Sequence, residues 1–124
     1  MSTYLTAFNN LVIKFNDELI ETFPEENEFK ISKNGILLLK KANPRKIVNI
    51  FKIYTKLYRE KIINQDDNFF LQNDYNDVLY NDSQKEDVFF LIDKLKNYWQ
   101  ILSDSNKKNI WKYLNTLLCL SDKC

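Results

Sequence analysis

A chain of 124 residues is the usual size of one domain, long enough to bury a hydrophobic core without disulfides or metals. Hydrophobic residues make up 44% of it and charged residues 28%, which is typical of a globular protein and excludes a disordered one. The formal net charge of +1 predicts no general affinity for nucleic acid or membrane surfaces.

Cysteine usage and apolar runs bear on the compartment. Cys119 and Cys124 are the two cysteines, and no basic and apolar leader of a secreted protein opens the sequence. We therefore expect a reducing, intracellular compartment. The longest uninterrupted apolar run, Val88 to Ile92, is far shorter than a membrane span, so no membrane contact is expected.

Residues 3 to 22 are predicted to form a helix, because apolar side chains recur there at steps of three and four. Ser2 or Thr3 can cap its start, and Pro24 cannot continue it. The predicted apolar face consists of Tyr4, Leu5, Phe8, Leu11, Val12, Phe15, Leu19 and Phe23.

Residues 25 to 42 carry two conflicting patterns. Four apolar residues fit one helical face that Gly35, the only glycine, interrupts: Phe29, Ile36, Leu39 and Ala42. However, Asn34-Gly35 between two apolar segments is a strong hairpin signal. We favour the helix, because the rest of the chain offers no sheet for a lone hairpin to join.

A third helix is predicted from Asn43-Pro44 to about residue 63. Asn is a favourable N-cap, and Pro is pre-set for the first helical position. The apolar face of this helix consists of Ile47, Ile50, Phe51, Tyr54, Leu57, Tyr58 and Ile62.

The connection from residue 64 to 84 is acidic and carries no Lys or Arg. Its five negative charges are Asp66, Asp67, Asp74, Asp77 and Asp82. Within it, Phe69, Phe70 and Leu71 are predicted to form a short helical turn that inserts into the core.

Two serine-led segments predict the remaining helices. Ser83-Gln84-Lys85-Glu86 is a capping box that opens a fourth helix. The inward residues of this helix are Val88, Leu91, Ile92, Leu95, Tyr98, Trp99 and Leu102. Ser103-Asp104-Ser105 ends that helix and caps the last one, which faces inward with Trp111, Leu114, Leu117 and Leu118. So short a turn predicts that the last two helices form an antiparallel pair.

The expected fold is all-α: a single domain, 1–124, built as a small bundle of four to five main helices plus a short helix near residue 69.

The absence of histidine excludes most catalytic arrangements. Neither a Ser-His-Asp nor a Cys-His site can form, and the commonest metal ligand is missing. Cys119 in a Leu-rich helix is interpreted as a small hydrophobic side chain, and two cysteines alone cannot complete a zinc site. We expect no catalytic residue and no small-molecule substrate.

The acidic residues do not fit a metal or sugar site either. An EF-hand loop started at Asp66 or Asp74 meets Phe70 or Val78 where an oxygen ligand is required, and no glycine follows. Three acids after Pro24 are better explained by the positive end of a helix dipole: Glu25, Glu26 and Glu28. With a single glycine, phosphate-cradling loops are excluded as well. No cofactor or metal is expected.

Basic residues gather in one part of the chain. Residues 33 to 61 hold nine Lys or Arg and one acid, Glu60. On the predicted third helix, steps of seven, four and three place four of them on one stripe: Arg45, Lys52, Lys56 and Arg59. This stripe is either a solvated face balanced by the acidic segment, or a docking surface for an acidic partner or nucleic-acid phosphates. Phe90, on the polar face of the fourth helix, is a further candidate partner contact.

Two stretches resemble small uncharacterised helical proteins of nucleocytoplasmic large DNA viruses. The first begins with Asn43-Pro44-Arg45-Lys46 and continues through Phe51, Tyr54, Tyr58 and Ile62 to Asp66-Asp67-Asn68-Phe69-Phe70. The second is Lys107-Lys108-Asn109-Ile110-Trp111-Lys112-Tyr113-Leu114. The resemblance implies a viral, non-enzymatic setting and assigns no functional residue.

Three functions are compatible with these patterns. The leading hypothesis is a protein-interaction or structural component of a virus particle or virus factory, with another protein as its partner. The second is a nucleic-acid accessory protein that binds phosphates through the basic stripe. The third is a decoy that holds a host amphipathic helix in an apolar groove, which requires an open cleft.

Overall fold

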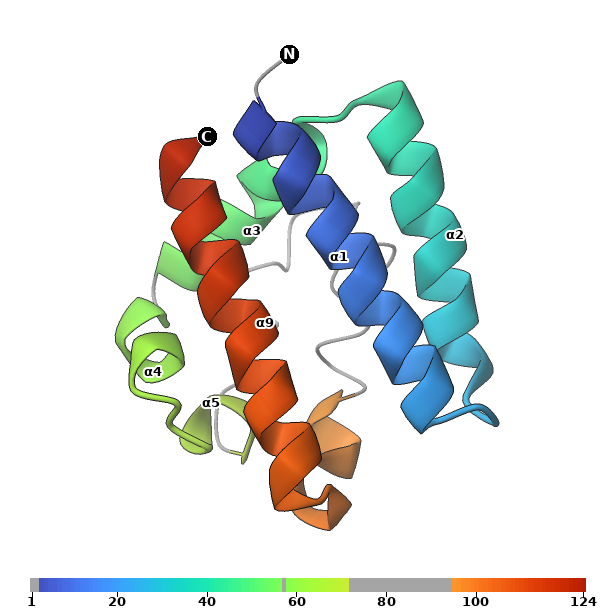
Figure 1. Ribbon diagram of the computed structural model, residues 1–124, viewed down its shortest axis with the longest axis vertical. Coiled ribbons are helices and arrows are strands. Elements are labelled where there is room, and N and C mark those ends of the chain that lie inside the picture. The colour runs from blue at the N-terminus through green and yellow to red at the C-terminus, as the bar shows by residue number, and fades with distance from the viewer. Residues whose placement is uncertain (1–2, 57, 72–94) are drawn as a thin grey trace.

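The protein is all-α, as the sequence predicts (Figure 1). The computed structural model describes residues 3–56, 58–71 and 95–124. Every regular element in these ranges is a helix: α1 (Thr3–Thr22), α2 (Asn27–Ala42), α3 (Lys46–Lys56), α4 (Arg59–Ile63), α5 (Asn68–Leu71), the 3-10 helix η1 (Trp99–Ile101) and α9 (Asp104–Lys123).

Helix α1 lies in the middle of the molecule, between α9 on one side and α2 on the other (Figure 1). Helix α3 packs across all three of them. The apolar face predicted for α1 enters the core, where five of its side chains are buried: Leu5, Phe8, Val12, Phe15 and Leu19. Tyr4, also predicted on this face, is exposed, so the prediction is wrong at this position. The predicted bounds of this helix are confirmed.

Two asparagines on the buried face of α1 tie it to its neighbours. Asn16 Nδ2 donates a hydrogen bond of 2.7 Å to the carbonyl of Phe29, at the start of α2. Asn9 Nδ2 donates one of 3.0 Å to the carbonyl of Pro44, in the turn before α3. Because a buried amide is destabilising unless it is hydrogen-bonded, these two contacts favour one placement of α1 against both segments.

Residues 27–42 form a helix and not a hairpin, so the favoured alternative is confirmed. Gly35 does not have a positive φ, and Asn34-Gly35 therefore continues the helix without a turn. Phe29 and Ile36 are fully buried, and this packing outweighs the local turn preference. The Glu26 carboxylate caps the start of α2 by accepting from the Glu28 N–H, which supports the helix-terminus explanation of the acidic residues there.

The predicted third helix is two helices, and its predicted start is also wrong. Asn43 ends α2, where its N–H bonds the Leu39 carbonyl, and α3 begins only at Lys46. Helix α3 then ends at Lys56, and α4 begins at Arg59. The break lets Ile62 enter the core completely. The Asn115 amide of α9 donates to the Ile62 carbonyl at 3.0 Å and fastens α4 to α9.

The short helix expected near residue 69 is present as α5. Phe69 and Phe70 are fully buried, as predicted, whereas Leu71 remains 39% exposed. The Phe70 ring stacks on Trp99 with 4.1 Å between ring centroids and lies 5.3 Å from the Trp111 ring. Helix α5 therefore supplies aromatic side chains to a cluster shared with η1 and α9.

The last helix starts and packs as the sequence predicts. The Ser103 side chain caps α9 by accepting from the Asn106 N–H at 3.1 Å. Its four predicted inward residues are buried: Trp111, Leu114, Leu117 and Leu118. The capping box at residues 83–86, Phe90 and most of the predicted fourth helix lie outside the described residues. Residues 95–98 are helical and continue into η1.

Candidate interaction surfaces

The four basic residues singled out by the sequence do not form one continuous helical stripe. Arg45 lies in the turn before α3, Lys52 and Lys56 lie on α3, and Arg59 opens α4. The stripe prediction is wrong in this respect, because it assumed an unbroken helix from residue 44 to 63. All four residues are nevertheless exposed.

Three of the four basic residues meet at one surface hollow. Lys52, Lys56 and Arg59 line a hollow of about 340 Å³, together with side chains from α3 and from the C-terminal end of α9: Thr55, Ser121 and Asp122. Arg45 is not part of its lining. We call this group of residues the basic hollow.

An acidic residue from the end of the chain enters the basic hollow. Asp122 accepts two hydrogen bonds from the Arg59 guanidinium, one of 2.9 Å from Nη1 and a second from Nη2. The Arg59 hydrogen bonds, aided by the charge of Lys52, lower the pKa of Asp122. The same contact raises the pKa of Arg59. One of the three positive charges is thereby partly neutralised.

Sequence reasoning missed Asp122, since it is 63 positions away from Arg59 and no local spacing joins them. Lys33 likewise pairs with Asp17 of α1 at 2.6 Å. Asp66, in the segment expected to balance the basic residues, accepts from the Asn68 N–H at the start of α5. The acids that pair with Lys33 and Arg59 therefore come from the first and last helices.

A second surface lies on the side of α2 that faces away from α1. Ile31 and Leu38 are 66% and 71% exposed, while Phe29 and Ile36 on the opposite side of the helix are fully buried. Helical spacing adds Gly35 and two exposed residues to the same side. We call this surface the outer α2 face, and it consists of Ile31, Asn34, Gly35, Leu38 and Ala42. The prediction that Ala42 shares the apolar face of Phe29 and Ile36 is therefore wrong, because Ala42 is exposed at the end of the helix.

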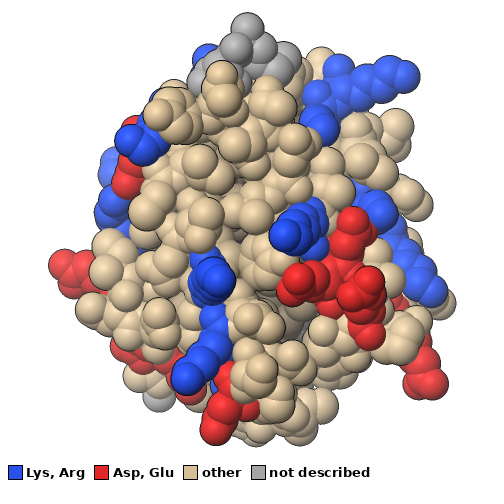
Figure 2. Space-filling model, viewed as in Figure 1, with Lys and Arg blue, Asp and Glu red and all other residues tan. Residues whose placement is uncertain are grey.

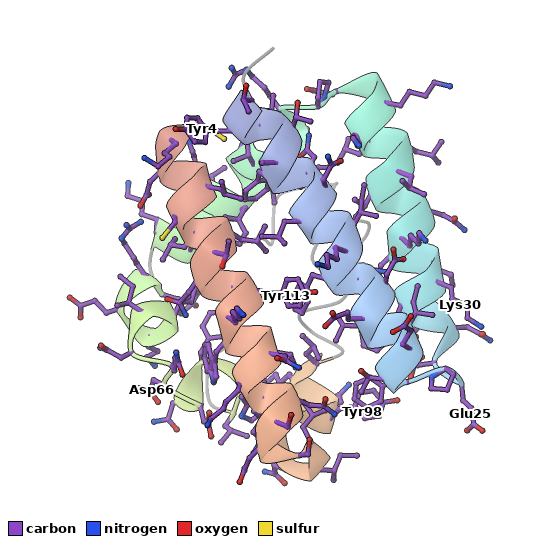
Figure 3. The ribbon with its side chains drawn as sticks, in the orientation of Figure 1. Tyr4, Glu25, Lys30, Asp66, Tyr98 and Tyr113 are labelled. Carbon is purple, nitrogen blue, oxygen red and sulfur yellow. The ribbon has the colours of Figure 1, made fainter. Side chains whose placement is uncertain are left out.

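Basic side chains border the outer α2 face. Lys30 and Lys41 lie together on one flank, with Leu37 between them. Figure 3 shows Lys30 pointing away from the body of the molecule. This surface is not among those that the sequence predicts. The available signal was Ile31 and Leu38, seven residues apart and off the predicted apolar face.

Other exposed apolar side chains are scattered over different helices. Ile53 on α3, Ile63 on α4 and Ile101 on η1 are each more than half exposed. Exposed apolar residues of this kind are common in globular proteins and are not evidence of a site. They do provide matched controls for the outer α2 face.

Tyr113 occupies the seam between α1 and α9 (Figure 3). Its ring stacks on Phe15 at 5.0 Å, and a hollow of about 300 Å³ opens beside it. Burial, assisted by a hydrogen bond to Glu18, raises the pKa of Tyr113 to about 12. The phenol is therefore protonated at neutral pH and serves as a hydrogen-bond donor, not as a base or nucleophile.

Charged side chains on the face formed by α1 and α9 are of both signs. Figure 2 shows Lys and Arg side chains interspersed with Asp and Glu across this view, so this face offers no extended field of one sign.

Cys119 is exposed on α9, which contradicts its interpretation as a small core residue. Its neighbours Leu117 and Leu118 take the buried positions instead.

The described residues hold no cluster of three or more acidic or cysteine side chains that suits a metal ion. None of the helices described above is long and apolar enough to cross a membrane. Comparison with family models, curated proteins and solved structures finds no significant match to this chain. Function is therefore inferred from its own surfaces.

Proposed function

We propose that this protein is a non-enzymatic protein-interaction or structural component that binds another protein through the outer α2 face. The observation that supports this most directly is the exposure of Ile31 and Leu38 on one side of a helix whose other side is fully buried. Complete burial of each side chain in an interface would contribute about 1.5–3 kcal/mol. The lack of histidine in the sequence supports a role outside catalysis.

A site-specific cross-link tests this proposal. A photoreactive residue at Asn34, in the centre of the outer α2 face, should form a protein adduct in the cells that make the chain. The adduct partner is then identified, purified and mixed with the purified chain. Binding should be lost in the variant with Ile31→Ser and Leu38→Ser.

The matched control is Ile101→Ser, because Ile101 is 75% exposed on η1. This variant should bind like the parent chain, and circular dichroism should show that all variants stay helical. An adduct yield at Asn34 no higher than that from a photoreactive residue at Ile53 would contradict the proposal. Reconstituted binding that survives the two serine substitutions would contradict it equally.

We further propose a viral setting, in a virus particle or virus factory within a reducing intracellular compartment. Its support is the resemblance of residues 43–70 and 107–114 to small proteins of nucleocytoplasmic large DNA viruses. Fractionation of infected cells with an antibody to the chain tests it. Signal confined to fractions that hold neither virions nor factories would contradict this setting.

A nucleic-acid accessory role is the second candidate, and the basic hollow is the observation that favours it. Lys52, Lys56 and Arg59 converge there, but Asp122 already occupies Arg59. Phosphate contacts of this kind are non-specific in sequence and weaken with salt. Lysine contributes point charges and not the planar, two-pronged contacts that read bases.

Two opposite charge changes test the nucleic-acid role. Replacing Lys52 and Lys56 with Glu should abolish retention of a 20-base-pair DNA duplex at low salt. Asp122→Asn should strengthen retention, since it leaves Arg59 without its carboxylate. No retention of duplex DNA or of single-stranded RNA by the parent chain at low salt would remove this candidate.

The decoy hypothesis requires an apolar groove that encloses a helix. The basic hollow and the hollow beside Tyr113 are lined mainly by charged and polar side chains. The outer α2 face is a convex helix surface. None of these three surfaces encloses a helix, so the decoy has less support than the other two functions.

A further inference from the structure

The outer α2 face has the spacing of a helix-packing surface. Ile31, Gly35, Leu38 and Ala42 follow one another at steps of four, three and four. This is the pattern by which one α-helix lies against another. At the helical rise per residue, the strip from Ile31 to Ala42 extends for about 16 Å, which suits a partner helix of about three turns.

Gly35 leaves a gap in this strip, because it has no side chain. We call this gap the notch. A glycine within a helix is unfavourable compared with alanine, and its backbone here does not need the positive φ that glycine permits. It stands between Ile31 and Leu38, the two most exposed large apolar side chains of α2. The missing side chain at this point allows the close approach of an apolar side chain from a partner.

The charges beside the strip indicate which partner fits. Lys33 and Lys40 are engaged within the chain, by Asp17 and by the side chain of Asn10. Lys30 and Lys41 form no ion pair with any described residue. Two positive charges that no described residue pairs with, on one flank of an apolar strip, favour a partner with negative charges on the facing flank.

A second copy of the chain fits this surface less well. In an antiparallel pair of α2 helices with Ile31 opposite Leu38 of the other copy, the same flanks of both helices face each other. Lys30 of one copy then lies close to Lys41 of the other, and this contact occurs twice. Like charges at such positions disfavour the pairing.

We infer that the outer α2 face binds an amphipathic helix of another protein, one whose apolar stripe is bordered by Asp or Glu. This inference rests on the proposed interaction function and names the chemistry of the partner. Ile31 and Leu38 would contact the apolar stripe of the partner helix, and Gly35 would admit one of its side chains. Lys30 and Lys41 would favour a partner whose facing flank is acidic.

A pair of labelled peptides tests the inference on the full chain. Both are 21-residue amphipathic helices with leucine at the two core heptad positions. One carries Glu at the flanking positions and the other carries Lys there. Each is used at nanomolar concentration in fluorescence anisotropy titrations, where the peptides themselves stay monomeric. The Glu peptide should bind at least about tenfold more tightly than the Lys peptide.

Charge reversal on the chain should reverse this preference. The variant with Lys30→Glu and Lys41→Glu should bind the Lys peptide more tightly than the Glu peptide. The matched control replaces Lys108 and Lys112 with Glu, which makes the same change in net charge at two exposed positions of α9, and it should leave the preference unchanged. Equal effects of both pairs would mean that only net charge matters, and the inference would be wrong.

Gly35→Ala separates docking from folding. The variant should melt at a higher temperature than the parent, because alanine favours the helix. It should also bind the Glu peptide about tenfold more weakly, because the added methyl group fills the notch. Unchanged or tighter binding would overturn the role given to Gly35.

The inference and the proposed function fail in different ways. If Ile31→Ser with Leu38→Ser disrupts a reconstituted complex but neither lysine nor peptide charge matters, the interaction function stands and the acidic helix is wrong. Failure of the parent chain to bind the Glu peptide overturns the inference. So does an Asn34 cross-link that forms only within the chain or to a second copy.

Discussion

Tyr113 illustrates how burial at a helix seam alters a single side chain. Its ring stacks on Phe15, and burial, followed by the Glu18 hydrogen bond, raises its pKa to about 12. In the unfolded chain the pKa is about 10. The folded state therefore holds the phenol proton more tightly, so this contribution to stability is complete below pH 10 and is lost as the pH rises through 12.

Urea unfolding of the parent chain and of Tyr113→Phe between pH 8 and pH 12 tests this reasoning. The parent should lose free energy of unfolding above pH 10 more steeply than the phenylalanine variant, which has no proton to lose at this position. The difference between the two free energies should be constant below pH 9. Parallel curves up to pH 12 would contradict the assigned effect of burial.

Ser103 is the residue that caps the start of helix α9. Its side chain satisfies one of the N–H groups at the start of α9, and α9 contributes five buried apolar residues to the core: Ile110, Trp111, Leu114, Leu117 and Leu118. Loss of this cap should therefore weaken the whole protein and not only one helix end.

Ser103→Ala should lower the free energy of unfolding by about 1 kcal/mol, and Ser103→Asp should keep most of it. Chemical denaturation followed by circular dichroism measures both. Ser105→Ala is the matched control, because Ser105 is exposed within the first turn of α9 and is not the cap. A Ser105→Ala loss as large as that of Ser103→Ala would contradict the capping role.

At the scale of the whole molecule, one aromatic cluster joins segments that are distant in sequence. Phe70 of α5 stacks on Trp99 of η1, and Trp99 meets Trp111 of α9 edge-on at 5.5 Å. All three side chains are buried. A protein of this size has a total stability of about 5–15 kcal/mol, so the loss of one large side chain from this cluster would remove a large fraction of it.

Phe70→Ala should lower the free energy of unfolding by about 3–5 kcal/mol, and Phe70→Leu by less, because leucine leaves a smaller cavity. The near-ultraviolet circular dichroism of the two tryptophans should decrease in the alanine variant. Leu71→Ala is the neighbouring control, since Leu71 is partly exposed, and it should cost less than Phe70→Ala. Equal losses at both positions would contradict the placement of Phe70 in the cluster.

The candidate surfaces could be predicted only in part. The exposure of Lys52 and Lys56 followed from helical spacing, because a stripe opposite the apolar face points to solvent. The pairing of Arg59 with Asp122 did not follow, because it depends on how α4 and α9 meet. The outer α2 face had only a weak signal in the sequence, the spacing of Ile31 and Leu38, since sequence does not say which side of a helix its neighbours leave uncovered.

The sequence by itself determined the helical class, the extent of α1, the start of α9 with its cap at Ser103, and the insertion of Phe69 and Phe70. These features depend on side chains three or four positions apart, whose periodicity is visible along the chain. Tertiary packing decided between helix and hairpin in α2, where Phe29 and Ile36 are buried against other helices. It also divided α3 from α4 and exposed Cys119, because these outcomes depend on contacts between residues far apart in sequence, which no local pattern records.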